Sequence, residues 1–135
     1  MRLPPAVIVH RLSDARTALG LGLPVTLLSA PGAAVYAGCG WWRALVERVR
    51  EENPGVPVRD ILDCGEASGQ AMAALRVRQQ LLVLLPSSSS WSAVAAMAEA
   101  AGGCVLPLAP PALDLAQPGA AQHLGNFVAS ANRPG

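Results

Sequence analysis

The chain has 135 residues, of which 52% are hydrophobic and 14% are charged, with a formal net charge of +1. This length suits one domain, and the apolar fraction is ample for a core without disulfides or a structural metal. The near-neutral charge, the scattered arginines and the few aromatic residues argue against nucleic acid as a partner, because phosphate binding needs a concentrated basic face.

The sequence contains no lysine. This excludes Schiff-base aldolases, enzymes that hold pyridoxal phosphate on a lysine, and phosphate loops that depend on one. We expect no cofactor. The three cysteines, Cys39, Cys64 and Cys104, lack CxxC spacing and are expected to be free thiols.

The beginning of the chain is too short and too interrupted by proline for a signal peptide, and no unbroken apolar run reaches the length of about 20 residues that a spanning helix requires. We therefore expect a cytoplasmic protein that does not interact with a membrane.

Five short apolar runs recur along the chain, and each is continuous rather than alternating. They cover residues 6–10, 25–29, 58–63, 81–85 and 104–108. Continuous runs rich in valine, isoleucine and leucine predict strands that are buried on both faces of a parallel sheet.

Helical segments separate these runs. Ser13 and Asp14 can cap a first helix that ends near Leu19, and residues 41–52 form the clearest amphipathic pattern. A third helix is predicted over residues 68–78. A fourth begins after Pro86 and ends at the glycine pair 102–103.

This alternation predicts a three-layer α/β fold with a five-stranded, mostly parallel sheet. We expect the flavodoxin-like strand order 2-1-3-4-5, and a sequential half β/α-barrel is the alternative. Residues 1–109 are predicted to form a single α/β domain. Residues 110–135, with weak periodicity at 120–129, are predicted to be a C-terminal extension that packs on the body or on a neighbouring subunit, with its last residues disordered.

Ligands of parallel α/β sheets bind at the carboxyl ends of the strands, so the residues that follow each strand are the candidates for a site. The loop after the second strand is rich in glycine and leads into a helix, which favours an anion. The candidate ligand-binding residues here are Ser29, Gly32, Gly38, Gly40 and Arg43. The alternative is a connecting loop with Arg43 in solvent.

The third strand ends in Asp63 and Cys64, followed by Glu66. A carboxylate there can act as a base or bind a hydroxyl group, and a cysteine near a helix N-terminus can act as a nucleophile. His10 can join Asp63 and Cys64 as a catalytic constellation if the first and third strands are adjacent. The alternatives are that Asp63 or Glu66 caps the helix and that Cys64 is core.

The serines after the fourth strand, Ser87 and Ser88 among them, can cap a helix or bind a ligand. The following helix, residues 91–101, is apolar nearly all round. This indicates contact with another subunit, with Trp91 as an anchor, or else cover from the C-terminal segment. The two histidines, His10 and His123, and the cysteines lack the spacing of metal ligands, so no metal is expected.

These observations predict a homodimer or larger oligomer that binds a small metabolite, with an anion as one candidate, at the carboxyl edge of the sheet. One alternative is an enzyme without a cofactor, a lyase, isomerase or hydrolase that uses His10, Asp63 and Cys64. Another is an interaction or scaffold protein. All three rest on the position of residues in a fold class.

Overall fold

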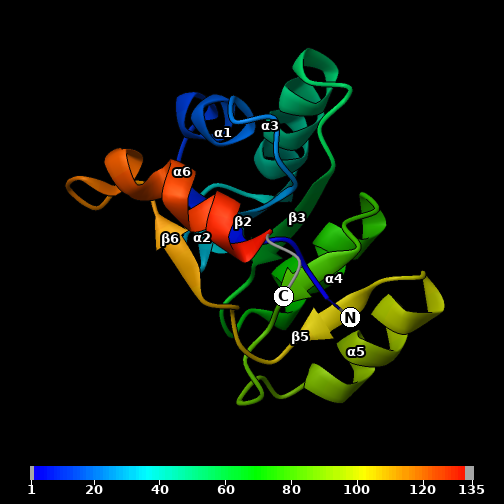
Figure 1. Ribbon diagram of the computed structural model, residues 1–135. Coiled ribbons are helices and arrows are strands. Elements are labelled where there is room, and N and C mark those ends of the chain that lie inside the picture. Colours follow the sequence, from blue (N-terminus) through cyan, green and yellow to red (C-terminus); the bar gives the residue numbers. More distant parts are fainter. Residues whose placement is uncertain (1, 133–135) are drawn as a thin grey trace. The chain divides into compact units, whose positions relative to one another are not determined.

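The computed structural model describes residues 2–132 of the chain, in which short strands alternate with helices (Figure 1). In chain order the elements are β1 (Ala6–Val9), α1 (Leu12–Leu19), β2 (Val25–Ser29), α2 (Ala33–Tyr36), α3 (Cys39–Glu52), β3 (Val58–Asp63), α4 (Ser68–Arg76), β4 (Leu81–Val83), α5 (Trp91–Ala100), β5 (Cys104–Leu106), β6 (Ala112–Asp114) and α6 (Ala120–Ala131). Within residues 2–132, no helix has both the length and the apolar character that a membrane crossing requires.

The strands form a six-stranded parallel sheet in the order β5-β4-β3-β2-β1-β6. The predicted α/β class with a parallel sheet is thus confirmed, and a three-layer arrangement agrees with it. The strand count and the order 2-1-3-4-5 were wrong. The first five strands follow one another in space as in the sequential alternative, and β6 adds beside β1. Strands buried on both faces give the same apolar runs in either order, so pairing between distant segments decides it.

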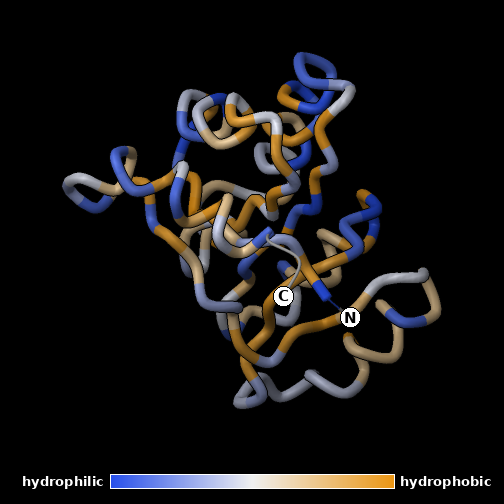
Figure 2. The backbone as a smooth tube through the Cα atoms, viewed as in Figure 1, coloured by the Kyte–Doolittle hydropathy of each residue, from blue (hydrophilic) through white to orange (hydrophobic). Residues whose placement is uncertain are grey.

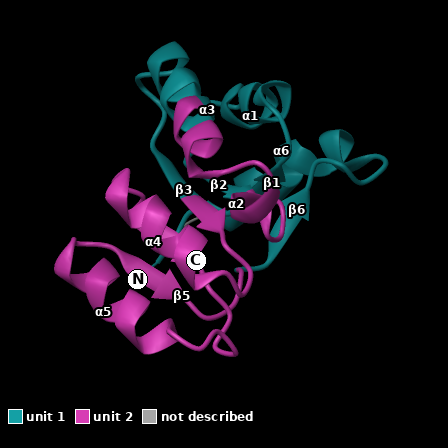
Figure 3. Cartoon of the chain, turned by 180° about the vertical axis from the view of Figure 1, so that it is seen from behind, with its two compact units in different colours: residues 1–28, 45–60, 110–135 teal, residues 29–44, 61–109 magenta. Residues whose placement is uncertain are grey.

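The described chain divides into two compact units (Figure 3). Unit 1 comprises Met1–Leu28, Leu45–Asp60 and Pro110–Gly135, and unit 2 comprises Ser29–Ala44 and Ile61–Ala109. The segment predicted as a C-terminal extension contributes β6 and α6 to unit 1. The predicted disorder at the end of the chain concerns residues 133–135, which lie outside the described residues.

In unit 1, helix α6 is a three-turn amphipathic helix within the segment that was predicted as a C-terminal extension. It buries Ala120, Leu124 and Val128, which are spaced by four residues and so share one face. The Asn132 amide at its end donates a hydrogen bond of 3.1 Å to the Pro24 carbonyl oxygen, just before β2. Helix α6 therefore reaches from β6 to the start of β2.

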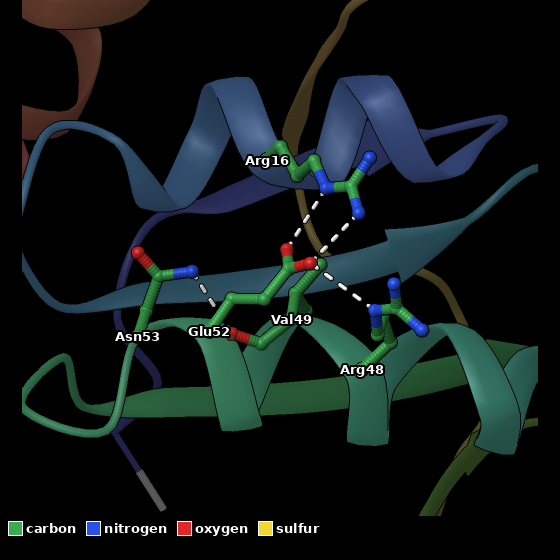
Figure 4. Close-up of polar contacts among 5 residues, drawn as sticks. All are labelled: Arg16, Arg48, Val49, Glu52 and Asn53. Atoms are coloured by element: carbon green, nitrogen blue, oxygen red, sulfur yellow. Dashed lines mark hydrogen bonds and ion pairs between the residues drawn. The ribbon is translucent and has the colours of Figure 1, made fainter.

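In unit 1, an ion-pair cluster joins helix α1 to the part of helix α3 from Leu45 onwards (Figure 4). Arg16 on α1 holds both carboxylate oxygens of Glu52 at 2.8 and 2.7 Å, and Arg48 Nε donates to the same carboxylate at 3.1 Å. The hydrogen bonds from Arg16 and then Arg48 lower the pKa of Glu52 to about 2, against an ordinary value of 4.5. Asn53 ends the helix by donating to the Val49 carbonyl at 2.9 Å.

In unit 2, helices α4 and α5 end in the same way. In each, an N–H two residues past the C-cap bonds to a carbonyl five positions back: Gln79 to Ala74 at 3.0 Å and Gly103 to Ala98 at 2.8 Å. This ending requires a left-handed residue, which is Gly102 after α5 but Arg78, at φ 66°, after α4. Along α5 and β5, Figure 2 shows mostly hydrophobic colours, as the sequence indicated.

Candidate functional site

The centre of the predicted site in unit 2 is Asp63, the last residue of β3. Its Oδ1 accepts hydrogen bonds from the backbone N–H groups of Gly32 at 3.1 Å and Gly65 at 2.8 Å. Its own N–H donates to Ser29 Oγ at 2.9 Å, and that hydroxyl donates to the Ala30 carbonyl at 3.2 Å. Ser29 and Asp63 are 1% and 6% exposed, so this network is buried.

In this arrangement the Gly32 N–H, one donor of the predicted anion site, has a partner within the protein. Gly32 adopts a left-handed φ of 69°, as glycine allows, but the carboxylate that its N–H binds is the protein's own. Asp63 thereby fastens the loop after β2 to the loop after β3. These hydrogen bonds join Ser29, Gly32 and Asp63, and the ligand-binding and catalytic roles predicted for them stay predictions.

The remaining residues of the predicted anion site are spread over α2 and α3. Gly38 has a left-handed φ of 88° between the two helices, and Gly40 lies in the first turn of α3. Arg43 follows one turn later and is half-buried, so it does not extend freely into solvent. The helix that the sequence placed at residue 41 begins two residues earlier, at Cys39.

Cys64 does not suit the nucleophile of the enzyme hypothesis. Its side chain is 0% exposed, and its N–H donates to the Val83 carbonyl of β4 at 2.8 Å. Burial, with smaller effects from Asp63 and Cys39, raises the pKa of its thiol to about 12. The thiol is therefore neutral at pH 7, and it belongs to the core.

The loops after β3 and β4 bring four polar side chains of unit 2 together in pairs. Ser87 Oγ donates to Glu66 Oε1 at 2.8 Å, and both residues are exposed. The hydroxyl groups of Ser68 and Ser88 contact each other, and Ser88 is buried. A backbone hydrogen bond from Leu85 to Gly65, 2.8 Å long, fixes the two loops against each other. Ser68 was not among the predicted residues.

Trp91, at the start of α5, is directed inward. Its Nε1–H donates to the Leu84 carbonyl at 2.6 Å and its side chain is half-buried. The role predicted for it as an anchor of a subunit contact stays a prediction. The N-cap of α5 is Ser90, whose side chain makes no capping hydrogen bond, and Ala67 at the N-cap of α4 has no side chain that could make one.

His10 lies in unit 1, directly after β1, and its partner is Asp114 rather than Asp63. The condition for a pair with Asp63 was that the first and third strands be neighbours, but β2 stands between them in the sheet. His10 Nε2 lies 2.7 Å from Asp114 Oδ1. Sequence reasoning missed Asp114 because it is the last residue of a three-residue strand that no apolar run predicts.

Each of the two described units contains a hollow. One lies against α6 in unit 1, is open, and has a volume of about 590 Å³; its lining includes Leu113, His123 and Phe127. The other, about 370 Å³, lies at the end of α4 in unit 2, beside Arg78 and Gln80. Among residues 2–132, no three side chains of histidine, cysteine, aspartate or glutamate gather as metal ligands would.

Two arrangements of polar side chains result: the Glu66–Ser87 and Ser68–Ser88 pairs at the carboxyl edge of unit 2, of which Glu66 and Ser87 are exposed, and the His10–Asp114 pair in unit 1. Comparison with known proteins adds nothing to this geometry: no model of a protein family matches the sequence, and no curated protein shows significant similarity to it.

Proposed function

We propose that this protein binds a small polar metabolite non-covalently at the carboxyl edge of its sheet, on the loops that follow β3 and β4. The observation that carries the proposal is the exposed Glu66–Ser87 pair beside the Ser68–Ser88 pair. Parallel α/β sheets bind their ligands at this edge. The support comes from position in the fold and from the chemistry of these four side chains.

The chemistry of this group favours a ligand with hydrogen-bond donors. A glutamate carboxylate accepts hydrogen bonds, whereas serine hydroxyls both donate and accept them. Hydroxyl or ammonium groups complement such a surface, and a phosphate would meet the negative charge of Glu66. We therefore favour a polyhydroxylated or amine-bearing ligand over the anion that the glycine loop suggested.

A thermal-shift screen tests this proposal. The panel comprises sugars, polyols and small amines, with phosphates and carboxylates as the contrasting set. A ligand present at a hundred times its Kd adds about 2.7 kcal/mol to the free energy of unfolding. For a domain of this size the melting temperature should rise by several degrees.

Two variants locate the site. Glu66→Gln removes the carboxylate charge and should weaken binding of any ligand found in the screen, measured by calorimetric titration. Glu99→Gln, on the exposed side of α5, removes the same charge elsewhere in unit 2 and should leave binding unchanged. Equal losses in the two variants, or a screen in which only phosphates bind, would contradict the proposal.

A second candidate function is self-association through α5. Helix α5 leaves a face of small residues exposed, on which Met97 is 44% exposed, and Leu108 beyond β5 is 73% exposed. β5 is an edge strand of the sheet, so its outer backbone groups are available for pairing. We propose a homodimer or larger oligomer on this surface.

Light scattering after gel filtration tests self-association. Wild type should be dimeric or larger at micromolar concentration, and Met97→Glu should be monomeric. Leu21→Glu, which alters a side chain 37% exposed in unit 1, is the matched control and should not change the mass. A monomeric wild type would refute this candidate. The cytoplasmic location belongs to the same proposal, since free Cys39, Cys64 and Cys104 suit a reducing compartment.

A further inference from the structure

His10 and Asp114 are brought together by the register of two parallel strands in unit 1. Ala6 pairs with Ala112 and Ile8 with Asp114, so Asp114 faces the same side of the sheet as Ile8. His10 follows Ile8 by two residues and, with the period of two in a strand, continues on that side. The Nε2–Oδ1 distance of 2.7 Å is that of a short hydrogen bond.

The surroundings fix the orientation of both side chains. Asp114 Oδ1 also accepts the Ala116 N–H at 2.9 Å, and the backbone N–H of His10 donates to Asp14 Oδ2 at 2.9 Å. Burial acts to raise the pKa of the Asp114 carboxyl, but the Ala116 N–H and the His10 ring outweigh it and hold that pKa below its usual value. Asp114 is therefore ionised at neutral pH, and its Oδ1 accepts a hydrogen bond from the Nε2–H group of His10.

A neutral imidazole that donates from Nε2 carries its lone pair on Nδ1. Among residues 2–132, no hydrogen-bond partner is found for Nδ1. The side chains of His10 and Asp114 are 30% and 26% exposed, so solvent reaches the pair. A histidine whose second nitrogen is held by a carboxylate, with the first nitrogen open, has the arrangement of a general base.

We propose that His10 and Asp114 form a general-base site, in which Nδ1 of His10 takes a proton from a water or hydroxyl group and Asp114 positions the ring. The proton would move to Nδ1 as the oxygen attacks an electrophilic carbon, and the resulting imidazolium is stabilised by the Asp114 carboxylate. Both residues belong to unit 1, so this inference is independent of the ligand site in unit 2.

Hydrolysis of p-nitrophenyl acetate is a suitable probe because it needs no knowledge of the natural substrate. Water loses a proton to Nδ1 as its oxygen bonds to the acetyl carbon, the bond to p-nitrophenolate breaks, and the ring returns the proton to solvent. His10→Gln should lose at least tenfold of the protein-dependent rate. His123→Gln removes the other histidine, exposed on α6, and should keep the rate.

The Asp114→Asn variant separates the two effects of Asp114 on His10, namely the orientation of the ring and the negative charge beside it. An asparagine oxygen can still accept from Nε2 and Ala116, so NMR of the ring nitrogens should show the proton on Nε2 while the rate falls about tenfold. Diethyl pyrocarbonate modification of the wild type, which needs no variant, should abolish the rate in step with modification of His10. Equal rates in His10→Gln and His123→Gln, or an acetyl-histidine that accumulates on His10 during turnover, would overturn the general-base role.

Discussion

Gly103 lies directly against the backbone of Gln80, and its replacement by alanine is a sharp test of the β4–β5 packing. A Cβ atom at this position would lie 2.1 Å from the carbonyl oxygen of Gln80 and 2.8 Å from its carbonyl carbon. Both atoms are backbone, so no side chain can swing away. The two segments would have to separate by about 1 Å for even a tight contact, since packed interiors yield little.

The cost follows from what this separation breaks. The hydrogen bonds from Cys104 N–H to the Gln80 carbonyl and from Gly103 N–H to the Ala98 carbonyl are both 2.8 Å long. Each contributes about 1 kcal/mol, and the strain of overpacking adds about 1–3 kcal/mol. We expect Gly103→Ala to lower the free energy of unfolding by about 3–5 kcal/mol. With about 2.1 cal/mol/K of unfolding entropy per residue, the melting temperature should fall by about 11–18 °C.

Urea and thermal unfolding followed by circular dichroism measure this loss of stability. Alanine substitutions at two other glycines of unit 2 serve as controls. Gly102→Ala has open space but a φ of 84°, so strain alone should cost about 1 kcal/mol. Gly69→Ala, inside α4 with open space, should be neutral or stabilising by up to about 1 kcal/mol. If Gly103→Ala costs no more than Gly102→Ala, the close approach of Gly103 to Gln80 is refuted.

Three further predictions concern other parts of the fold. Arg78→Gly should stabilise the chain by about 0.5–1 kcal/mol in urea unfolding, because glycine relieves the left-handed φ after α4. The pKa of Glu52 is lowered to about 2, so its ion pairs with Arg16 and Arg48 stabilise the fold above pH 4.5 and are lost as the pH falls towards 2. Urea unfolding at low salt should therefore show that Glu52→Gln loses less stability than wild type between pH 6 and pH 2.5. Cys64, with its pKa raised to about 12, should react with iodoacetamide at pH 8 more slowly than the two other cysteines, as peptide mapping by mass spectrometry would show.

A different result would contradict each of these three predictions. A destabilised Arg78→Gly would mean that the arginine side chain contributes more than its backbone strain costs. Parallel acid losses in Glu52→Gln and wild type would show that the exposed ion pairs contribute nothing measurable, as is common at surfaces. Rapid labelling of Cys64 in the folded protein would contradict its burial, and unfolding in urea should equalise the three cysteines.

The individual elements were largely predictable because they depend on local pattern. The apolar runs 25–29 and 58–63 coincide with β2 and β3, and helix α3 ends at Glu52 as predicted. The run at 104–108 overshot β5 by two residues, since a chain can leave the sheet while its residues are still apolar. Strand β6 was missed because three residues after two prolines carry no signal of their own, and they become a strand only by pairing with β1.

The candidate site depended far more on tertiary contacts. The sequence indicated that Asp63, Glu66 and the serines after β4 lie at strand ends, and the structure places them there. It held no indication that Asp63 binds the Gly32 and Gly65 amides, since a loop glycine looks the same whether its N–H meets a ligand or a carboxylate of the protein. Likewise, no sequence pattern predicts that His10 and Asp114, which are 104 residues apart, form a pair.

The sequence by itself therefore determined the α/β class and the absence of lysine chemistry, because periodicity and composition are properties of short segments. Only the tertiary structure decided the strand order, the neutral buried state of Cys64 and the pairing of His10 with Asp114. Each of these arises where segments distant in the chain meet, and there burial and hydrogen bonding set the chemistry of a side chain.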